Sequence, residues 1–293
     1  LQGGIPAADI DALAPYWAIC PQLKATLFTP NRPGYLDLAV AKTAIQSAIF
    51  DHPEFIAFST GLKAHFAAWR ALNVPRLQAL ASGCHPKEII VWLAEGLLAH
   101  YQGQPLIDPY AVYQHLMDYW TATLQDDAYL IAADGWRAET SRIIATAKTG
   151  KPRDKGWTCD LIPKALIVAR YFAREQATLD QIAADLEVFS ARLTELEEEQ
   201  VGEEGAFAEL DRVNKASVSA RLKEIQGDPE ARDEAAVLVD WLKLNGEETA
   251  RKKLLREGDA ALDALAYARY ATLTEAEIKT LVVEDKWLAT LAA

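Results

Sequence analysis

The amino-acid sequence predicts a mainly α-helical protein, in which a helical domain and a small β-element are followed by a long antiparallel helical hairpin or coiled coil. Apolar residues recur at helical spacings through most of the 293 residues. Between residues 161 and 196 they follow the alternating spacing of three and four that is typical of a coiled-coil seam. We expect three segments: a helical domain at 1–126, a β-element with a basic loop at 127–163, and the hairpin with a terminal helix at 164–293.

In the first segment, prolines mark the expected starts of helices. Pro53, Pro86 and Pro109 each stand before a run of residues with helical apolar spacing, and proline is favoured at the first helical position. Asp108 is a suitable N-cap for the third run. We therefore expect helices at Glu54–Leu72, Lys87–Tyr101 and Tyr110–Leu124.

The second segment has shorter apolar runs. Ala128–Ala133 is a short apolar run, Asp134 and Gly135 form a turn signal, and Ser141–Ala147 follows as a second short run. Short apolar runs bounded by turn residues are typical of strands. The sequence therefore predicts a small β-element, followed by a polar and basic loop at Lys148–Trp157.

The third segment contains the coiled-coil seam. We expect one long helix from about Pro163 to about Gln200, with Glu175 as the one polar interruption of its apolar positions. A second helix after Asp228-Pro229 is its expected antiparallel partner, and Thr274 with Glu277 forms a capping box for a terminal helix. The apolar positions of the seam are Leu161, Ala165, Val168, Phe172, Leu179, Ile182, Leu186, Phe189, Leu193 and Leu196.

Composition and charge exclude several classes of protein. No stretch of about eighteen apolar residues occurs, so we expect no membrane span. The three cysteines are far apart and odd in number, which favours free thiols and a cytoplasmic location. The net charge is −12, and residues 164–293 carry 27 acidic and 17 basic side chains. This acidic part would repel phosphate, so we do not expect it to be the main nucleic-acid contact.

Motifs of common catalytic centres are missing from the sequence. No two glycines lie two residues apart, so there is neither a G-x-G-x-x-G fingerprint nor an F-x-G-x-G cofactor loop. No two prolines are adjacent, which excludes the Pro-Pro tetrad of amino-group DNA methyltransferases. We therefore predict no catalytic, cofactor-binding or metal-binding residue in this chain.

Two weaker polar patterns remain. His115 and Asp118 stand three residues apart on an expected helix and, with Asp126 and Asp127, could supply metal ligands or a general base. Exposed helix and turn positions explain the same residues more simply. Basic side chains of the loop could contact a DNA backbone or an acidic partner, although a solvated loop is again the simpler explanation. They are Lys148, Lys151, Arg153 and Lys155.

Several long strings resemble the C-terminal part of the modification subunit of type I restriction–modification enzymes. They lie throughout the chain and none is a catalytic motif. They are Arg32-Pro33-Gly34-Tyr35, Tyr113–Trp120, Asp126–Trp136, Asp160–Phe172 and Leu273–Leu291.

The resemblance implies a function that the motifs do not. In that family the subunit transfers a methyl group from S-adenosylmethionine to the N6 atom of adenine in duplex DNA, a separate specificity subunit reads the sequence, and two modification subunits clasp it. The family's cofactor loop and catalytic tetrad lie upstream of the resembling region. The resemblance therefore implies an inactive piece of a longer methyltransferase that serves subunit assembly and DNA clamping. Its partners would be the specificity subunit and, through it, a second modification subunit, the restriction subunit and DNA.

We carry three hypotheses forward from the sequence. In the first, the C-terminal helices of an assembly region pack on the specificity subunit, through the seam residues Phe172, Leu179, Ile182, Leu186, Phe189 and Leu193. The same residues could instead pack within the chain, because seam positions are more often core. The second hypothesis is an autonomous α-helical metalloenzyme that uses His115, Asp118 and Asp127. The third is a structural coiled-coil adaptor with no link to methylation.

Overall fold

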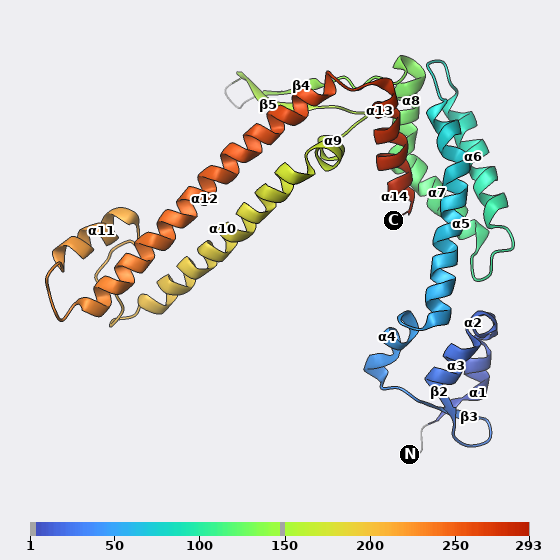
Figure 1. The fold of residues 1–293 in the computed structure, drawn as a ribbon, viewed down its shortest axis with the longest axis horizontal. Coiled ribbons are helices and arrows are strands. Elements are labelled where there is room, and N and C mark those ends of the chain that lie inside the picture. The colour runs from blue at the N-terminus through green and yellow to red at the C-terminus, as the bar shows by residue number, and fades with distance from the viewer. Residues whose placement is uncertain (1–3, 147–149, 293) are drawn as a thin grey trace. The chain divides into compact units, whose positions relative to one another are not determined.

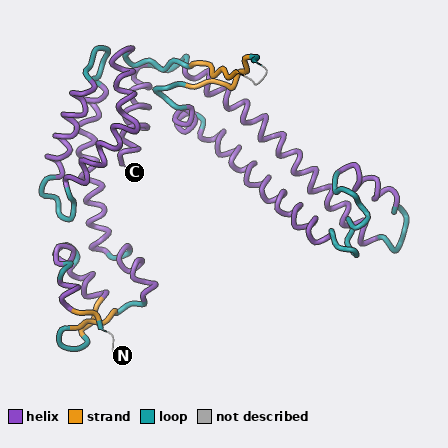
Figure 2. Tube along the Cα trace, turned by 180° about the vertical axis from the view of Figure 1, so that it is seen from behind, coloured by secondary structure: helices purple, strands orange, loops and turns teal. Residues whose placement is uncertain are grey.

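The computed structural model describes residues 4–146 and 150–292 and is mainly helical (Figures 1 and 2). The chain packs into two compact units, of which the first contains residues 1–138 and 274–293 and the second contains residues 139–273. These bounds differ from the three segments expected from the sequence, because the terminal helix packs with the first unit. None of the described helices is long and apolar enough to cross a membrane.

The first unit begins with a small three-stranded sheet and short helices. The strands are antiparallel in the order β1-β3-β2, and Cys20, Leu23 and Leu27 form a small core beside them. The elements of this part are β1 (Ile5–Pro6), α1 (Ala7–Asp11), α2 (Ala14–Ile19), α3 (Pro21–Leu27), β2 (Phe28–Pro30), β3 (Tyr35–Leu38), the 3-10 helix η1 (Lys42–Ala44) and α4 (Ile45–Phe50).

Longer helices make up the rest of the first unit, and their starts confirm the proline signals. His52 and Asp108 accept hydrogen bonds from the backbone at the starts of α5 and α7, where proline is the first helical residue. The elements are α5 (Pro53–Gln78), α6 (Pro86–Tyr101), α7 (Pro109–Tyr119), the π-helix η2 (Trp120–Leu124), α8 (Gln125–Asp134), α13 (Glu275–Lys279), the π-helix η3 (Thr280–Leu288) and α14 (Ala289–Ala292).

The expected strand at Ala128–Ala133 is wrong, because these residues belong to helix α8. Asp127, Ala128 and Ile131 are buried together, at spacings of three and four that a helix brings to one face. Gly135 ends the helix with a φ of 72°. The apolar run was too short for its period to distinguish a helix from a strand.

In the second unit, the described residues 139–146 and 150–273 form a two-stranded ribbon and four helices. Strand β4 (Ser141–Thr146) pairs antiparallel with β5 (Pro152–Thr158), so the expected basic loop is partly a strand. The helices are α9 (Lys164–Tyr171), α10 (Ala173–Gln200), α11 (Lys215–Glu224) and α12 (Arg232–Tyr270).

Helices α10 and α12 pack along one another and run in opposite directions, with α11 beside the start of α12 (Figure 1). Their contacts give the register. Trp241 of α12 donates a hydrogen bond to Glu197, and nearer the start of α10, Ser190 donates one to Glu248. Gly258 meets Leu179 so closely that a Cβ atom at this glycine would collide with Leu179 Cδ2. The glycine therefore allows the two helices to approach here.

The expected single helix from Pro163 to Gln200 is wrong, because the chain bends at Phe172, which has φ −130° and ψ 31°. Ile167 and Val168 of α9 are both buried, although adjacent residues of one helix point 100° apart and only Val168 belongs to the seam. The bend separates the buried residues of α9 from those of α10, such as Leu179.

Candidate functional site

The seam residues of α10 face α12 within the second unit. Leu193 is buried in a cluster with Leu238, Trp241 and Leu244 of α12, and Phe189 packs against the same cluster. Leu179 is buried at Gly258, while Ile182 and Leu186 are half-buried. Helix α12 therefore covers much of the seam that the sequence suggested as a contact for the specificity subunit.

Phe172 lies apart from these residues, at the bend between α9 and α10. Nearby, the hydroxyl of buried Tyr270 donates a 2.6 Å hydrogen bond to the carbonyl of Ile162. The guanidinium of Arg269 lies 4.2 Å from the ring centroid of Tyr171. These contacts fasten α9 to the end of α12.

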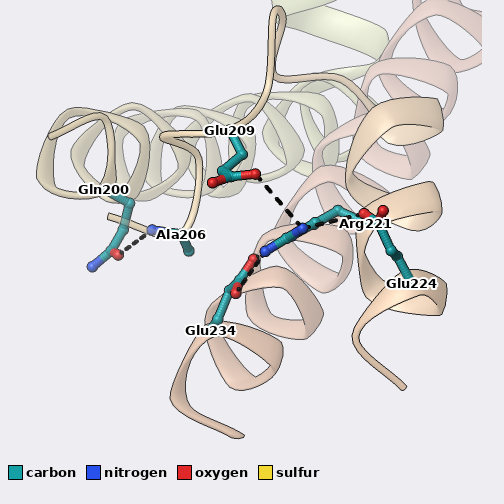
Figure 3. Close-up of polar contacts among 6 residues, drawn as sticks. All are labelled: Gln200, Ala206, Glu209, Arg221, Glu224 and Glu234. Atoms are coloured by element: carbon teal, nitrogen blue, oxygen red, sulfur yellow. Dashed lines mark hydrogen bonds and ion pairs between the residues drawn. The ribbon is translucent and has the colours of Figure 1, made fainter. Parts of the chain in front are cut away.

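At the other end of the pair, Arg221 joins three segments of the chain (Figure 3). Its Nε and Nη2 atoms donate to the two carboxylate oxygens of Glu234, over 2.7 and 3.3 Å. Its Nη1 atom lies 3.2 Å from Glu224 and 3.9 Å from Glu209. The hydrogen bond to Glu234 is the main reason that the pKa of Arg221 is raised. The fork geometry fixes α11 on α12 and holds the preceding loop nearby.

A tight turn after α10 holds the aromatic side chain of Phe207. The backbone N–H of Ala206 donates to Gln200 Oε1 over 3.1 Å, and the N–H of Phe207 donates to the carbonyl of Gln200 (Figure 3 shows the first bond). A Cβ atom at Gly205 would collide with the backbone of Gln200, so only glycine fits. Phe207 is thereby buried against Trp241.

Three of the four basic residues singled out from the sequence lie on or beside β5. Arg153 pairs with Ala145 of β4, Lys155 lies in the irregular part of the ribbon, and Lys151 directly precedes β5. All three are exposed. Lys148 lies outside the described residues.

The root of the ribbon packs on α12 through Trp157. Its indole N–H donates a 2.9 Å hydrogen bond to Asp263, and its ring lies 5.3 Å from the centroids of Tyr267 and Tyr270. Lys164 also binds Asp263, over 2.7 Å. These hydrogen bonds, with that from Lys164 the stronger influence, lower the pKa of Asp263.

The structure does not gather the residues of the metalloenzyme hypothesis. His115 and Asp118 are exposed on α7, where Gln114 donates a hydrogen bond to Asp118. Asp126 is also exposed, whereas Asp127 is buried. Among the described residues, no three His, Cys, Asp or Glu side chains are placed to share a metal ion.

Asp127 instead accepts two hydrogen bonds from the C-terminal segment of the same unit. Lys286 Nζ lies 2.7 Å and Trp287 Nε1 2.8 Å from its Oδ2 atom. Burial raises the pKa of Asp127, while the bonds from Lys286 and Trp287 act in the opposite direction. Burial and this carboxylate also raise the pKa of Tyr119, whose hydroxyl is buried without a described partner. The arrangement neutralises a buried charge and offers no open position for a substrate.

The first unit also contains an apolar cavity of about 460 Å³, lined by Trp17, Cys20, Leu23 and Phe58 among others. Leu106 lines it from the loop before α7, with an unusual φ of 61°. Burial raises the pKa of the Cys20 thiol, with a smaller contribution from Glu54. A neutral thiol is a poor nucleophile, so the cavity carries no evident chemistry.

Sequence reasoning missed the partners of Asp127 and the role of Arg221. Lys286 and Trp287 lie about 160 residues from Asp127, and no local pattern connects them. For Arg221, Glu224 three residues later was a local signal of an ion pair. Glu234 could be paired with it only once the reversal between α11 and α12 was known.

Comparisons of the chain with models of protein families, with curated protein sequences and with solved structures find no match. The resemblance to type I modification subunits therefore depends on the five sequence strings alone.

Proposed function

We propose that this chain is an assembly region of a type I restriction–modification DNA methyltransferase, and that its α10–α12 pair forms a coiled coil that docks on the helices of a specificity subunit. The observation that carries the docking role is an exposed apolar face along α12. The five resembling strings supply the identity of the partner.

The exposed apolar face of α12 borders the side that contacts α10 at Gly258. Val239, Leu254 and Leu265 are about half exposed and lie 15 and 11 residues apart, close to four and three helical turns. They therefore share one side of the helix. Buried Leu238 and Trp241 occupy the side that packs on α10 and α11. Small side chains such as Ala250 and Ala261 lie between the exposed residues, and they leave room for a partner helix to approach.

This proposal moves the partner contact from the seam to the exposed apolar face of α12. The seam residues Leu179, Phe189 and Leu193 support the coiled coil from within, because α12 covers them. Val239, Leu254 and Leu265 then contact the specificity subunit.

The wider setting follows from the resemblance. Through the specificity subunit the chain would join a second modification subunit, the restriction subunit and the DNA that they clamp, in the cytoplasm. S-adenosylmethionine would bind the parent methyltransferase. The present chain has no F-x-G-x-G loop, so we propose no cofactor site and no catalytic step on it.

The test is a binding measurement with the specificity subunit from the same operon as the parent gene. Leu254→Glu with Leu265→Glu should weaken binding about tenfold or more, because both charges would enter an apolar contact. The matched control is Thr249→Glu with Ala260→Glu, which adds the same charge at exposed positions on another side of α12. Equal losses in both variants would contradict docking through this face.

Two further results would decide against the proposal as a whole. Binding of S-adenosylmethionine by this chain at micromolar concentration would show a cofactor site that the proposal denies. The upstream gene sequence is the second result. If it lacks the cofactor loop or the Pro-Pro tetrad, the adaptor hypothesis is favoured instead.

A further inference from the structure

The β4–β5 ribbon differs in charge from the rest of the chain. Its described residues carry four basic side chains and one acidic one, in a protein with a net charge of −12. Arg142 and Asp154 form an ion pair of 3.6 Å, which leaves three cations. Lys151, Arg153 and Lys155 are exposed and have no ion-pair partner among the described residues. The described part of the ribbon therefore carries a local excess of positive charge.

The pairing of the strands shows which way these side chains point. Arg142 pairs with Trp157 on the face that packs on α12, since Trp157 binds Asp263 and Arg142 lies 5.3 Å from the ring of Tyr267. Without an irregularity, Arg153 would lie on that same face, because it is four residues from Trp157.

A β-bulge in β5 moves Arg153 to the opposite face. Between the pairs Arg142–Trp157 and Ile144–Asp154, two residues of β5, Lys155 and Gly156, oppose a single residue of β4. Gly156 has a φ of +105°, which favours glycine, and its N–H donates a 2.8 Å hydrogen bond to Asp154. As a result Arg153 pairs with Ala145 on the face turned away from α12. The bulge thus directs a cation outward while Trp157 stays anchored.

Two isoleucines of β4 lie beside the cations and are also exposed. Ile143 is 41% exposed and Ile144 is 59% exposed, and they lie in the strand opposite Asp154 and Lys155. Strand alternation places Ile143 on the face of Arg153 and Ile144 on the face of Arg142. An exposed isoleucine beside cations without ion-pair partners indicates a ligand that offers both anionic and apolar groups.

We infer that the β4–β5 ribbon is a contact for duplex DNA, in which Lys151, Arg153 and Lys155 bind backbone phosphates and Ile143, on the same face as Arg153, contacts base edges in a groove. The major groove of DNA admits a two-stranded ribbon, and apolar side chains there meet thymine methyl groups. The inference deepens the proposed function, since it assigns the DNA contact to one ribbon of this chain. It does not require the specificity subunit for its test.

The experiment measures binding of the full chain to a fluorescein-labelled 20-base-pair duplex by anisotropy between 50 and 200 mM KCl. Three phosphate contacts predict that log K falls against log salt with a slope of about −2.7, or a loss of roughly 40-fold across this range. Lys151→Gln with Arg153→Gln and Lys155→Gln should abolish this slope. Arg153→Gln alone should reduce it by about 0.9.

A matched control removes the same charge from α12, by Lys252→Gln with Lys253→Gln and Arg256→Gln, all at exposed positions. This control should keep the slope. Ile143→Ser should weaken binding several-fold without changing the slope, because no charge is lost. Circular dichroism of each variant checks that the ribbon changes leave the helices intact.

Three outcomes would overturn the inference. One is wild-type binding with no salt dependence, and another is an equal loss of slope in the ribbon and control variants. The third is stronger binding to polyglutamate than to the duplex, which would identify an acidic protein partner instead. Each is distinct from a failure of the α12 docking test, which uses other residues and another ligand.

Discussion

Two aspartates, one in each unit, have the same kinds of partner and opposite pKa shifts. Asp127 in the first unit and Asp263 in the second each accept hydrogen bonds from a lysine and from a tryptophan indole, at distances between 2.7 and 2.9 Å. The side chain of Asp127 is 5% exposed and that of Asp263 is 43% exposed. The pKa of Asp127 is raised, chiefly by burial, whereas the pKa of Asp263 is lowered, chiefly by Lys164.

The comparison indicates that the burial of the aspartate, more than the identity of its partners, decides how much such a charged contact contributes to stability. In the first unit the lysine and indole offset the cost of removing a carboxylate from water. In the second unit water still solvates the carboxylate, so the same partners add a small favourable contribution. The first unit should therefore depend strongly on its polar contact, while the second depends mainly on the apolar packing of α10, α11 and α12.

Removing the lysine should give the largest difference in stability between the two aspartate sites. Lys286→Met leaves a buried carboxylate without its cation and should cost about 3–5 kcal/mol of stability at pH 7. Lys164→Met removes the equivalent contact at a half-exposed site and should cost less than about 1 kcal/mol. Residues 275–292 and 262–270 belong to different units, so amide hydrogen exchange of these segments should be measured for each variant.

The combined change Lys286→Met with Asp127→Asn provides the control. It removes both charges while Asn can still accept from Trp287, so much of the lost stability should return. If the double variant is as unstable as Lys286→Met alone, lost packing and not the unpaired charge explains the effect.

Replacing the indoles should give a smaller difference in the same direction. Trp287→Phe takes one of two donors from buried Asp127 and should cost about 1–3 kcal/mol from the lost bond, beyond the change in volume. Trp157→Phe makes the same change at Asp263, where water can replace the indole, so its bond should contribute less than about 1 kcal/mol. Urea unfolding of the two variants, compared with wild type, measures this difference. Equal costs would mean that burial does not matter here.

The sequence could predict most of the local structure of both regions but not this contrast. Proline and cap signals located the starts of α5, α6 and α7, and Thr274 with Glu277 forms the expected capping box. Such signals lie within a few residues of the helix start, so the sequence alone contains them. The bend at Phe172 and the helical state of Ala128–Ala133 depend on what each segment packs against, and the sequence therefore did not show them.

The candidate residues were affected in the same way. Asp127 was singled out from the sequence for its neighbouring carboxylate, yet its environment is set by Lys286 and Trp287, far along the chain. The seam residue Leu193 was expected to pack on a helix of this chain or of a partner, and its neighbours on α12 became known only from the structure. Arg153 was found from its charge, whereas its outward direction depends on the bulge at Gly156. The sequence shows the type of each residue, but it does not show how deeply a side chain is buried or which way it points.

The smallest expected effect, the pH dependence of stability, has opposite signs at the two aspartates. A raised pKa means that native Asp127 holds its proton above the ordinary value of 3.8, so stability falls as pH rises from about 4 through the raised value. The lowered pKa of Asp263 means that stability is present above 3.8 and is lost as pH falls through the lowered value. Because Asp263 is nearly half exposed, its contribution should stay below about 1 kcal/mol.

Asparagine at each position separates the two contributions. The stability of Asp127→Asn relative to wild type should rise as pH increases above about 4, because the variant lacks a carboxylate that is costly to ionise. Asp263→Asn should instead show a deficit that is constant above pH 4 and shrinks below it. Urea unfolding of both variants at half-unit pH intervals would measure these trends. If Asp127→Asn instead becomes less stable relative to wild type as pH rises, the bonds from Lys286 and Trp287 outweigh burial in setting the pKa of Asp127. The pKa shifts of the two aspartates would then differ in size and not in sign.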